Sequence, residues 1–404
     1  MNILYLCDEY PPGRHGGIGT VVQMLAKELV QQGHNVVVAG FYDWGYGGDD
    51  EFDDNGVKVY RFRRVLASGM FARQDKLLIR GIYKLLRRSG VFQWDIKHSL
   101  GRYKDFLEAL ITRHSIDIIE MPDYNDYIRF CKQTVPFPKM SVPVVVKLHG
   151  SLTYIGRNNG QAVPGYVAAT ERQILQQADA VCAVSKYRAE KAIEFGEYNG
   201  RIDVVYNGIN VQDIEPGQPS SARINRVVYT GALSENKGIF NLARAWNIVN
   251  SRFPDARLII LGKGPVDRVR TLIDPRYHKN VDFRGHVDRH TLLNTLKSST
   301  IAVFPSLTES FALAPMEAMM CGTAVVYTTR SSGPELISHN ENGILADPTD
   351  VGNIADSICY LYQNQDICSK IAQAGKERII SEFDITVVAK KNIAYYKSVV
   401  EKKK

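Results

Sequence analysis

Two glutamates eight residues apart flank the predicted start of a helix in the second half of the chain. Glu309 lies in a short loop after an apolar run, and Glu317 lies inside a helix predicted to begin near Ala312 and to end at Gly322. Backbone N–H groups at a helix start bind anions, with help from the helix dipole. An anion site between two carboxylates suits a molecule with a central phosphate and hydroxyl groups at both ends, such as a sugar nucleotide. The alternative is two solvated glutamates on an amphipathic helix.

Glycine-rich loops follow three of the predicted strands. The loop from Gly231 to Gly238 contains Lys237, which could reach a diphosphate as a point charge. Gly262 follows the next strand along the chain, and the pair Gly16-Gly17 follows the first strand. Glycine lets a backbone approach another group closely. One such loop is usually only a turn, but several loops at strand ends together indicate a phosphate-binding region.

One histidine and one acidic cluster also suggest chemistry. His149 ends the apolar run at residues 144–148, which places it at the mouth of the first domain's binding region, although a lone histidine is more often structural. Five acids between residues 49 and 54 lie in a glycine-rich stretch and are predicted to be solvated. The six cysteines are scattered without a C-x-x-C pair, so neither a zinc site nor a disulfide framework is predicted.

The bulk composition indicates an ordinary globular chain of two or three domains. It has 404 residues, 45% of them hydrophobic, and a formal net charge of +7. Apolar runs are shorter than the ~20 residues that span a bilayer, and the N-terminus lacks a basic signal region, so a cytoplasmic location is predicted. Basic residues gather between Arg61 and Arg88. They could face an anionic membrane, an anionic acceptor or nucleic acid, or form a solvated helical face.

Strands alternate with helices in two series of similar size. The apolar patterns predict, among others, helices at residues 20–32, 75–88 and 239–252 and a strand at 257–261. The pattern predicts an α/β protein with parallel sheets and three parts: a domain at residues 1–208, a second at 209–384, and a helix at 385–404 that returns to the first domain. A segment at 211–224, rich in proline, glycine and serine, is a candidate linker. Because ligands of parallel sheets bind at the carboxyl ends of the strands, two such sheets facing each other would form a cleft.

At the level of motifs, the chain resembles the retaining glycosyltransferases of family 4, the "group 1" enzymes with the GT-B fold of two Rossmann-like domains. Residues 309–317 match the E-x7-E motif of that family, and residues 231–238 match its phosphate loop. Residues 205–208, 333–337 and 342–345 match further elements, as do Gly16-Gly17, His149-Gly150 and residues 184–186. The resemblance covers nearly the whole chain, although residues 42–105 match poorly.

The resemblance implies a role for each site residue. Glu309 would contact the hydroxyls of the donor sugar, and Glu317 would hold the ribose. Lys237 would hold the diphosphate together with the backbone N–H groups of Phe311, Ala312 and Leu313. Gly231 and Gly262 would line the donor site from neighbouring loops, Gly16 and Gly17 would let the first domain close on the phosphates, and His149 would position the donor sugar.

Two positions depart from the family pattern. Ala232 stands where the phosphate loop usually carries an arginine, so one phosphate cation is missing, and Lys263, Arg14 and Arg330 are candidates to replace it. Ala312 stands where a glycine is usual, and its small side chain is expected to fit.

The implied reaction is transfer of a hexosyl unit, with retention and without a metal or other cofactor, from a UDP- or GDP-linked sugar. The acceptor would be a glycan or a lipid-linked saccharide in surface polysaccharide assembly, with peripheral membrane contact through the Arg61–Arg88 region and no nucleic-acid partner. Three rivals stay open: a nucleotide-sugar epimerase of the same architecture, a non-catalytic sugar- or nucleic-acid-binding protein, and a dinucleotide-dependent dehydrogenase. The last is disfavoured because the glycines at 16–19 have the wrong spacing for G-x-G-x-x-G.

Overall fold

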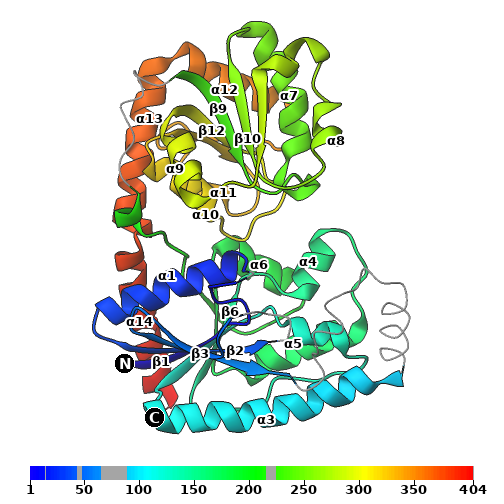
Figure 1. Cartoon of the computed structure of the whole chain (residues 1–404), viewed down its shortest axis with the longest axis vertical. Helices are drawn as coiled ribbons and strands as arrows, with labels where there is room; N and C mark the ends of the chain where they lie inside the picture. Colours follow the sequence, from blue (N-terminus) through cyan, green and yellow to red (C-terminus); the bar gives the residue numbers. More distant parts are fainter. Residues whose placement is uncertain (14, 43–47, 65–88, 215–223, 404) are drawn as a thin grey trace. The chain divides into compact units, whose positions relative to one another are not determined.

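The chain folds into two compact α/β units (Figure 1). The computed structural model describes residues 1–13, 15–42, 48–64, 89–214 and 224–403. One unit comprises Met1–Tyr206 together with Val388–Lys404, and the other comprises Asn207–Val387. The predicted fold class of two Rossmann-like domains is confirmed.

The first unit is built on one sheet with helices and short 3-10 turns between its strands. Its elements in chain order are β1 (Asn2–Leu6), α1 (Gly17–Gln31), β2 (Asn35–Tyr42), β3 (Glu51–Asp54), β4 (Val57–Arg63), α3 (Val91–His114), β5 (Ile118–Pro122), η1 (Asp126–Phe130), β6 (Val144–Leu148), α4 (Leu152–Asn158), α5 (Gly165–Gln177), β7 (Ala180–Ala183), α6 (Lys186–Glu194) and β8 (Ile202–Val204).

The strands of this sheet lie in the order β3-β4-β2-β1-β5-β6-β7-β8. All pairs are parallel except β3 with β4. The central strands are continuous apolar runs, as expected for strands covered on both faces. Strand β1 therefore pairs with β2 on one side and with β5 on the other. The strands that follow β1 in the chain extend the sheet first toward one edge and then, from β5 on, toward the other.

The second unit repeats this plan with six strands. Its elements are η2 (Val211–Asp213), β9 (Ile224–Thr230), η4 (Glu235–Lys237), α7 (Ile239–Arg252), β10 (Arg257–Leu261), α8 (Val266–Arg270), η5 (Pro275–Asn280), β11 (Val281–Gly285), α9 (Arg289–Lys297), β12 (Ser299–Phe304), α10 (Leu313–Met320), β13 (Ala324–Thr328), α11 (Gly333–Leu336), β14 (Ile344–Ala346), α12 (Val351–Gln363), α13 (Gln365–Arg378) and η6 (Ile379–Phe383). The order is β11-β10-β9-β12-β13-β14, and every pair is parallel.

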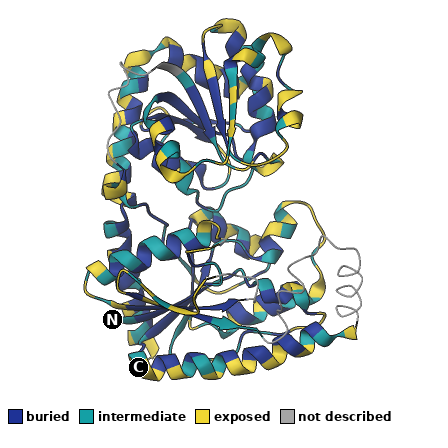
Figure 2. Cartoon of the chain, in the orientation of Figure 1, coloured by how far each residue is buried: buried dark blue, intermediate teal, exposed yellow. Residues whose placement is uncertain are grey.

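Each unit has its own apolar core between sheet and helices, seen as dark blue interiors in Figure 2. In the second unit, α7 and α12 pack against each other and on the sheet, and the fully buried Trp246 of α7 lies in that layer. Both helices are amphipathic, and their apolar stripes predict which face is covered. These rigid cores hold the loops at the carboxyl ends of the strands.

The last helix, α14 (Ile385–Lys403), carries the chain from the second unit into the first. Its Tyr396 is fully buried, donates a 2.6 Å hydrogen bond to Glu120 on β5, and lies 3.0 Å from the hydroxyl of Tyr5 on β1. Asn392 accepts from the buried Lys147 on β6 at 3.2 Å. These hydrogen bonds anchor residues 388–403 on the sheet of the first unit.

Some sequence expectations were wrong or fall outside the described residues. Four of the five acids at 49–54 are exposed, as predicted, but Glu51–Asp54 is a strand that pairs antiparallel with β4 and not a loop. Asp54 accepts hydrogen bonds from Tyr10 and Gln23 and forms a 2.9 Å ion pair with Lys27. A helix expected at 75–88 lies outside the described residues, as does most of the candidate linker.

Candidate functional site

The second unit has a hollow at the carboxyl ends of its central strands. Strand β9 lies between β10 and β12, which makes it the switch point where parallel sheets bind ligands. The hollow is lined by Thr230 at the end of β9 and Phe304 at the end of β12. It is also lined by Lys237 of η4, by Glu309 and Ala312 of the loop after β12, and by Pro315 of α10. The structure therefore brings together several residues that the sequence assigns to the donor. We call this hollow the charged hollow.

Lys237 and Glu309 form an ion pair across the charged hollow. Lys237 Nζ lies 2.5 Å from Glu309 Oε2, and both side chains keep partial access to solvent, at 36% and 14% exposure. Lys237 is positioned by the short helix η4, which Gly238 ends in a left-handed conformation. A Cβ at residue 238 would meet the carbonyl oxygen of Pro305 at 1.7 Å, so only glycine fits there.

The helix α10 starts at the charged hollow without a side-chain cap. Ala312 is its N-cap residue and offers no capping side chain, so the N–H groups of the first turn have no partner from a cap. Pro315 is the third helical residue, where it costs no intrahelical hydrogen bond. The helix ends before Gly322, whose φ is +69°. Both helix boundaries predicted from the sequence are confirmed, and the uncapped turn can hold an anion.

Glu317 lies in the second turn of α10 and has a cationic partner that the sequence did not reveal. Arg289 Nη1, at the start of α9, donates to Glu317 Oε1 at 2.7 Å. Glu317 is 9% exposed while the Arg289 side chain is 46% exposed. Since Arg289 comes from a different strand-helix connection, sequence spacing gave no signal for this pair.

The glycine loops after β9 and β10 also have a structural role. Gly231 donates its N–H to Leu261, and a Cβ on Gly262 would meet the carbonyl oxygen of Gly231 at 1.8 Å. The loops after β9 and β10 therefore pack directly on each other. A glycine is therefore required at position 262 for the packing of these two loops, independently of any role in ligand binding.

Lys263, one of the candidates to replace the missing phosphate-loop arginine, lies next to that loop. Its carbonyl accepts the N–H of Leu233, next to Ala232, at 2.9 Å, and its side chain is exposed. Arg330 lies 3.5 Å from Asp347 and also contacts Thr349, so its charge is partly neutralised. Arg14 lies outside the described residues.

In the first unit, the glycine pair at the start of α1 is held by an acid that the sequence analysis did not single out. Glu9 accepts the N–H of Gly16 at 3.1 Å and that of Gly19 at 2.8 Å. A Cβ on Gly19 would clash with the carbonyl of Glu9 at 2.0 Å, whereas a Cβ on Gly17 would meet nothing within 4 Å. A ligand phosphate at this helix start would compete with the Glu9 carboxylate.

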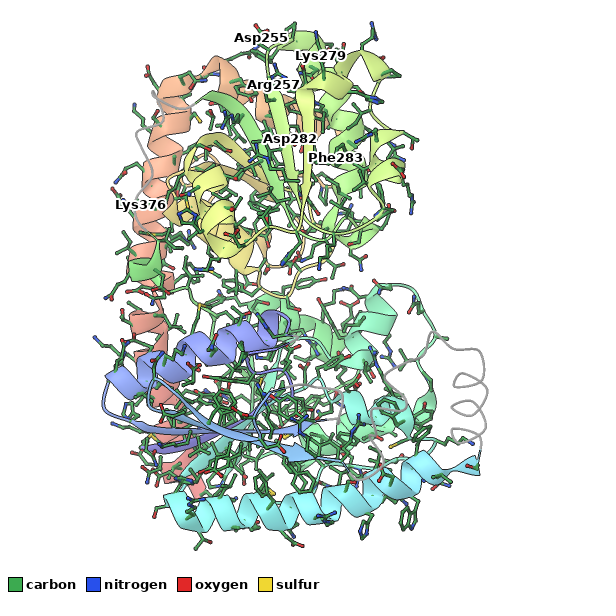
Figure 3. The ribbon with its side chains drawn as sticks, in the orientation of Figure 1. Asp255, Arg257, Lys279, Asp282, Phe283 and Lys376 are labelled. Atoms are coloured by element: carbon green, nitrogen blue, oxygen red, sulfur yellow. The ribbon has the colours of Figure 1, made fainter. Side chains whose placement is uncertain are left out.

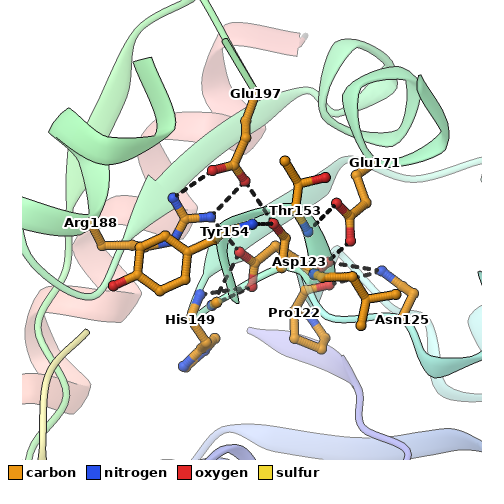
Figure 4. A network of polar contacts seen from close by, with 12 residues as sticks. Pro122, Asp123, Asn125, His149, Thr153, Tyr154, Glu171, Arg188 and Glu197 are labelled. Carbon is orange, nitrogen blue, oxygen red and sulfur yellow. Dashed lines mark hydrogen bonds and ion pairs between the residues drawn. The ribbon is translucent and has the colours of Figure 1, made fainter. Parts of the chain in front are cut away.

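His149 follows β6 and is held through its backbone (Figure 4). Asp123, which follows β5, accepts the N–H of His149 at 2.8 Å and that of Gly150 at 3.0 Å. Burial, followed by the positive charges of Lys147 and Arg188, lowers the pKa of His149 to about 3. The imidazole is therefore neutral near pH 7 and can donate or accept a hydrogen bond, but it carries no charge.

A buried charge cluster stands behind Asp123. Arg188 is fully buried, donates to Asp123 at 2.9 Å and to Glu197 at 2.8 Å, and lies 4.3 Å from the centre of the Tyr154 ring (Figure 4). Ser151 Oγ also donates to Glu197, at 2.8 Å. Three segments that are distant in the chain meet here, around Asp123, Ser151–Tyr154 and Arg188–Glu197, so no local pattern could have predicted the cluster.

The basic stretch does not form the membrane-facing surface that was expected, at least in its described part. Arg61 is only 3% exposed, because its guanidinium donates to the carbonyls of Tyr10 and Pro12. Arg63 pairs with Asp50 at 2.6 Å. These arginines hold the domain's own loops, so that expectation was wrong for Arg61 and Arg63. The stretch at 65–88 lies outside the described residues.

A basic hollow of about 310 Å³ lies at the edge strand β11, apart from the carboxyl ends of the central strands. Arg270, His278 and Lys279 line it beside Phe283, and Figure 3 labels Lys279 and Phe283 in the second unit. Among the described residues, no three His, Cys, Asp or Glu side chains are grouped to hold a metal ion. No described helix has the length and apolar character to cross a bilayer. All six cysteines are buried and free.

Two Rossmann-like units, each built on a largely parallel sheet, define the GT-B class of fold. The sequence agrees: the family model for group 1 glycosyl transferases matches residues 212–378, and the model for glycosyltransferase family 4 matches residues 15–213. The chain belongs to this glycosyltransferase family, and the resemblance found in its motifs is confirmed.

Relatives span the whole chain at low identity. An uncharacterised glycosyltransferase of Methanocaldococcus jannaschii is 28% identical over 99% of both chains, and a glycogen synthase of Mycobacterium tuberculosis is 27% identical over 96% of this chain and 92% of its own. Among solved structures, sucrose-phosphate synthase of Thermosynechococcus elongatus matches with a TM-score of 0.74 at 18% identity, covering 98% of both chains. The Anabaena protein HepE, solved with UDP and glucose, matches with a TM-score of 0.66 at 17% identity, over 98% of this chain and 100% of its own.

Proposed function

We propose that this glycosyltransferase transfers a hexosyl unit from a UDP- or GDP-linked sugar to a glycan or lipid-linked saccharide. The observation that carries the donor assignment is the charged hollow, in which Lys237, Glu309 and the uncapped start of α10 meet at the switch point of the second sheet. A cation and a helix start bind the diphosphate, while a carboxylate accepts hydrogen bonds from sugar hydroxyls. Solved structures of the same fold hold UDP and glucose, or UDP-2-fluoro glucose, which supports this donor class.

The proposed chemistry needs no nucleophile from the protein. Breaking the bond between sugar and phosphate leaves negative charge on the diphosphate, and Lys237 with the N–H groups of α10 stabilises that charge where it develops. Retention of configuration, by attack from the face that the diphosphate leaves, and independence of a metal are part of the proposal. Glu317 would hold the ribose, with Arg289 fixing its carboxylate through the 2.7 Å hydrogen bond.

The lipid-linked acceptor and a peripheral place at the cytoplasmic membrane face rest on the basic residues between Arg73 and Arg88. The measurement is sedimentation with anionic vesicles at low salt, for the wild type and for Arg87→Glu with Arg88→Glu. Equal sedimentation of both proteins would contradict membrane contact through this stretch, as would failure of the wild type to bind.

The donor site is tested by calorimetric titration of the full chain with UDP, GDP and ADP, and with NAD as the control ligand. We expect one nucleoside diphosphate to bind saturably, and Lys237→Ala to weaken it about 10- to 100-fold, because a charge-assisted contact contributes about 1.5–3 kcal/mol. The matched control is Lys370→Ala, an exposed lysine on α13 outside the charged hollow. Equal affinity of Lys237→Ala and wild type would contradict the assignment.

Release of the nucleotide separates transfer from epimerisation. A transferase sets nucleoside diphosphate free only when an acceptor is present, whereas an epimerase returns a nucleotide sugar. Release that depends on an added saccharide acceptor supports the proposal, and conversion of one nucleotide sugar into another without release would contradict it.

A further inference from the structure

A second hollow lies within the first unit, at the switch point of its sheet. Leu6 ends β1, Phe41 lies near the end of β2, and Met121 and Pro122 end β5, and all of them line this hollow. It therefore occupies the place in the first sheet that the charged hollow occupies in the second, where parallel sheets bind ligands. None of the residues assigned above to the donor belongs to it. We call it the aromatic hollow.

The hydroxyl of Tyr103 in the aromatic hollow is buried without a hydrogen bond. Tyr103 lies on α3 and is 1% exposed. The centroid of its ring lies 5.2 Å from the ring centroids of both Phe41 and Phe62. No described residue donates to or accepts from its Oη. Leaving a buried hydroxyl unpaired costs about 1–3 kcal/mol, so native proteins normally satisfy such groups with a partner, a water or a ligand.

A carboxylate faces the same space. Asp8, directly after β1, accepts the N–H of Phe41 at 2.7 Å through Oδ1, and the described residues supply no hydrogen bond or ion pair to Oδ2. Burial is the main cause that raises the pKa of Asp8 to about 6. Burial, and after it the negative charge of Asp8, raises the pKa of Tyr103. Oδ2 of Asp8 and the hydroxyl of Tyr103 can therefore both hydrogen-bond one ligand group in this hollow.

The size and chemistry of the aromatic hollow define what fits. It offers about 20 Å³ to a water-sized group, which is room for one water or one hydroxyl. Among its described lining residues there is no lysine, arginine or histidine, so a phosphate would find no counter-charge. The guanidinium of Arg64 lies 5.8 Å from the ring of Phe41, and its charge opposes the effect of burial on the pKa of Asp8. A positive charge is therefore already present nearby, which disfavours a second cation such as an ammonium.

We propose that the aromatic hollow binds one hydroxyl group of a saccharide acceptor, which Asp8 Oδ2 and Tyr103 Oη hydrogen-bond together. This inference rests on the proposed function, since it assigns the acceptor to the first unit. The hydroxyl would displace a water and reproduce its hydrogen bonds, which is the condition for gaining affinity. The half-buried ring of Tyr124 at the hollow offers a flat surface for the apolar face of the sugar.

The test is saturation-transfer NMR titration of the full chain, without nucleotide, with D-glucose, D-mannose, D-galactose and N-acetyl-D-glucosamine. We expect at least one of them to bind wild type in the millimolar range and to bind Tyr103→Phe about tenfold more weakly, because one hydrogen bond is lost. Asp8→Asn should show a similar loss. The matched control is Tyr362→Phe, which removes another buried, unpartnered tyrosine hydroxyl, in the core of the second unit.

Thermal unfolding separates binding from folding. Tyr103→Phe removes a hydroxyl that has no partner, so its stability should equal or exceed that of the wild type, and a loss of binding then cannot be attributed to misfolding. Equal saccharide affinity in wild type and Tyr103→Phe, or no binding of any of the four sugars to wild type, would overturn the proposal and leave the hollow as a site for water. The nucleotide titration with Lys237→Ala uses the other unit and no saccharide, so the two proposals fail independently.

Discussion

The two units place a hollow at the same point of the same kind of sheet but line it with opposite chemistry. The charged hollow of the second unit has Lys237, Glu309 and an uncapped helix, whereas the aromatic hollow of the first has rings, Asp8 and the hydroxyl of Tyr103. The fold determines where a ligand binds, and the loop residues decide whether that ligand is anionic or neutral.

The charges of the two units also differ in burial, and burial separates structural from functional roles. In the first unit, Arg188 and the carboxylates of Asp123 and Glu197 are at most 4% exposed and form ion pairs with one another. In the second unit, the Lys237–Glu309 pair keeps contact with solvent. We expect changes in the first cluster to affect folding and changes in the second pair to affect catalysis.

The largest expected effect follows from removal of Arg188. Arg188→Met leaves Asp123 and Glu197 buried without their cation, and breaking a buried pair in this way costs about 3–5 kcal/mol of stability. Urea unfolding followed by circular dichroism should show this loss. The control is Arg201→Met, whose ion pair with Asp203 is largely exposed and should contribute less than about 1 kcal/mol. Equal stability of the two variants would contradict the distinction.

The opposite result is expected for Glu309→Gln, which should lower activity and leave stability nearly unchanged. We expect kcat to fall about 100-fold, because the amide lacks the charge that the proposed transition state requires, while the free energy of unfolding changes by less than about 1 kcal/mol. Nucleotide release in the presence of a saccharide acceptor measures the first quantity, and urea unfolding measures the second. A large loss of stability with kcat unchanged would place the pair among the structural ones.

A smaller effect is expected at Lys263, a candidate to compensate for Ala232. Lys263→Ala should weaken binding of the nucleoside diphosphate about tenfold, because it removes a cation next to the phosphate loop. Arg330→Ala should have a weaker effect, since Asp347 already partly neutralises that guanidinium. Calorimetry on both variants ranks the two candidates, and the opposite ranking would assign the missing cation to Arg330.

A separate expected effect is a pH dependence of stability that arises in the first unit. Glu171 accepts the N–H groups of Leu152 and Thr153, and burial is the main cause that raises its pKa from 4.5 to about 7. The folded state therefore holds this proton more tightly than the unfolded chain does. The stabilisation is fully present below pH 4.5 and is lost as pH rises through about 7. Thermal unfolding from pH 4.5 to 8 should show that decline, and Glu171→Gln should flatten it; an unchanged slope in the variant would contradict this cause.

Local patterns in the sequence predicted the regular elements well. The bounds of α7 (Ile239–Arg252) and β10 (Arg257–Leu261) were predicted as the structure has them, because apolar periodicity and glycine stops are local signals. The helix α1 starts at Gly17, earlier than the predicted Thr20, because Glu9 holds the N–H groups of Gly16 and Gly19 from outside the helix. A cap supplied from a preceding loop gives no periodic signal.

By itself, the sequence determined the class of fold and the family, and it singled out Lys237, Glu309 and the start of α10, since these are set by short segments whose spacing is fixed along the chain. The partnership of Glu317 with Arg289, the cluster of Asp123, Arg188 and Glu197, and the meeting of Asp8 with Tyr103 were decided only by the tertiary structure. Parallel strands bring loops from distant connections to one edge of a sheet, and the chemistry of such an edge depends on strand order, which residue spacing does not encode.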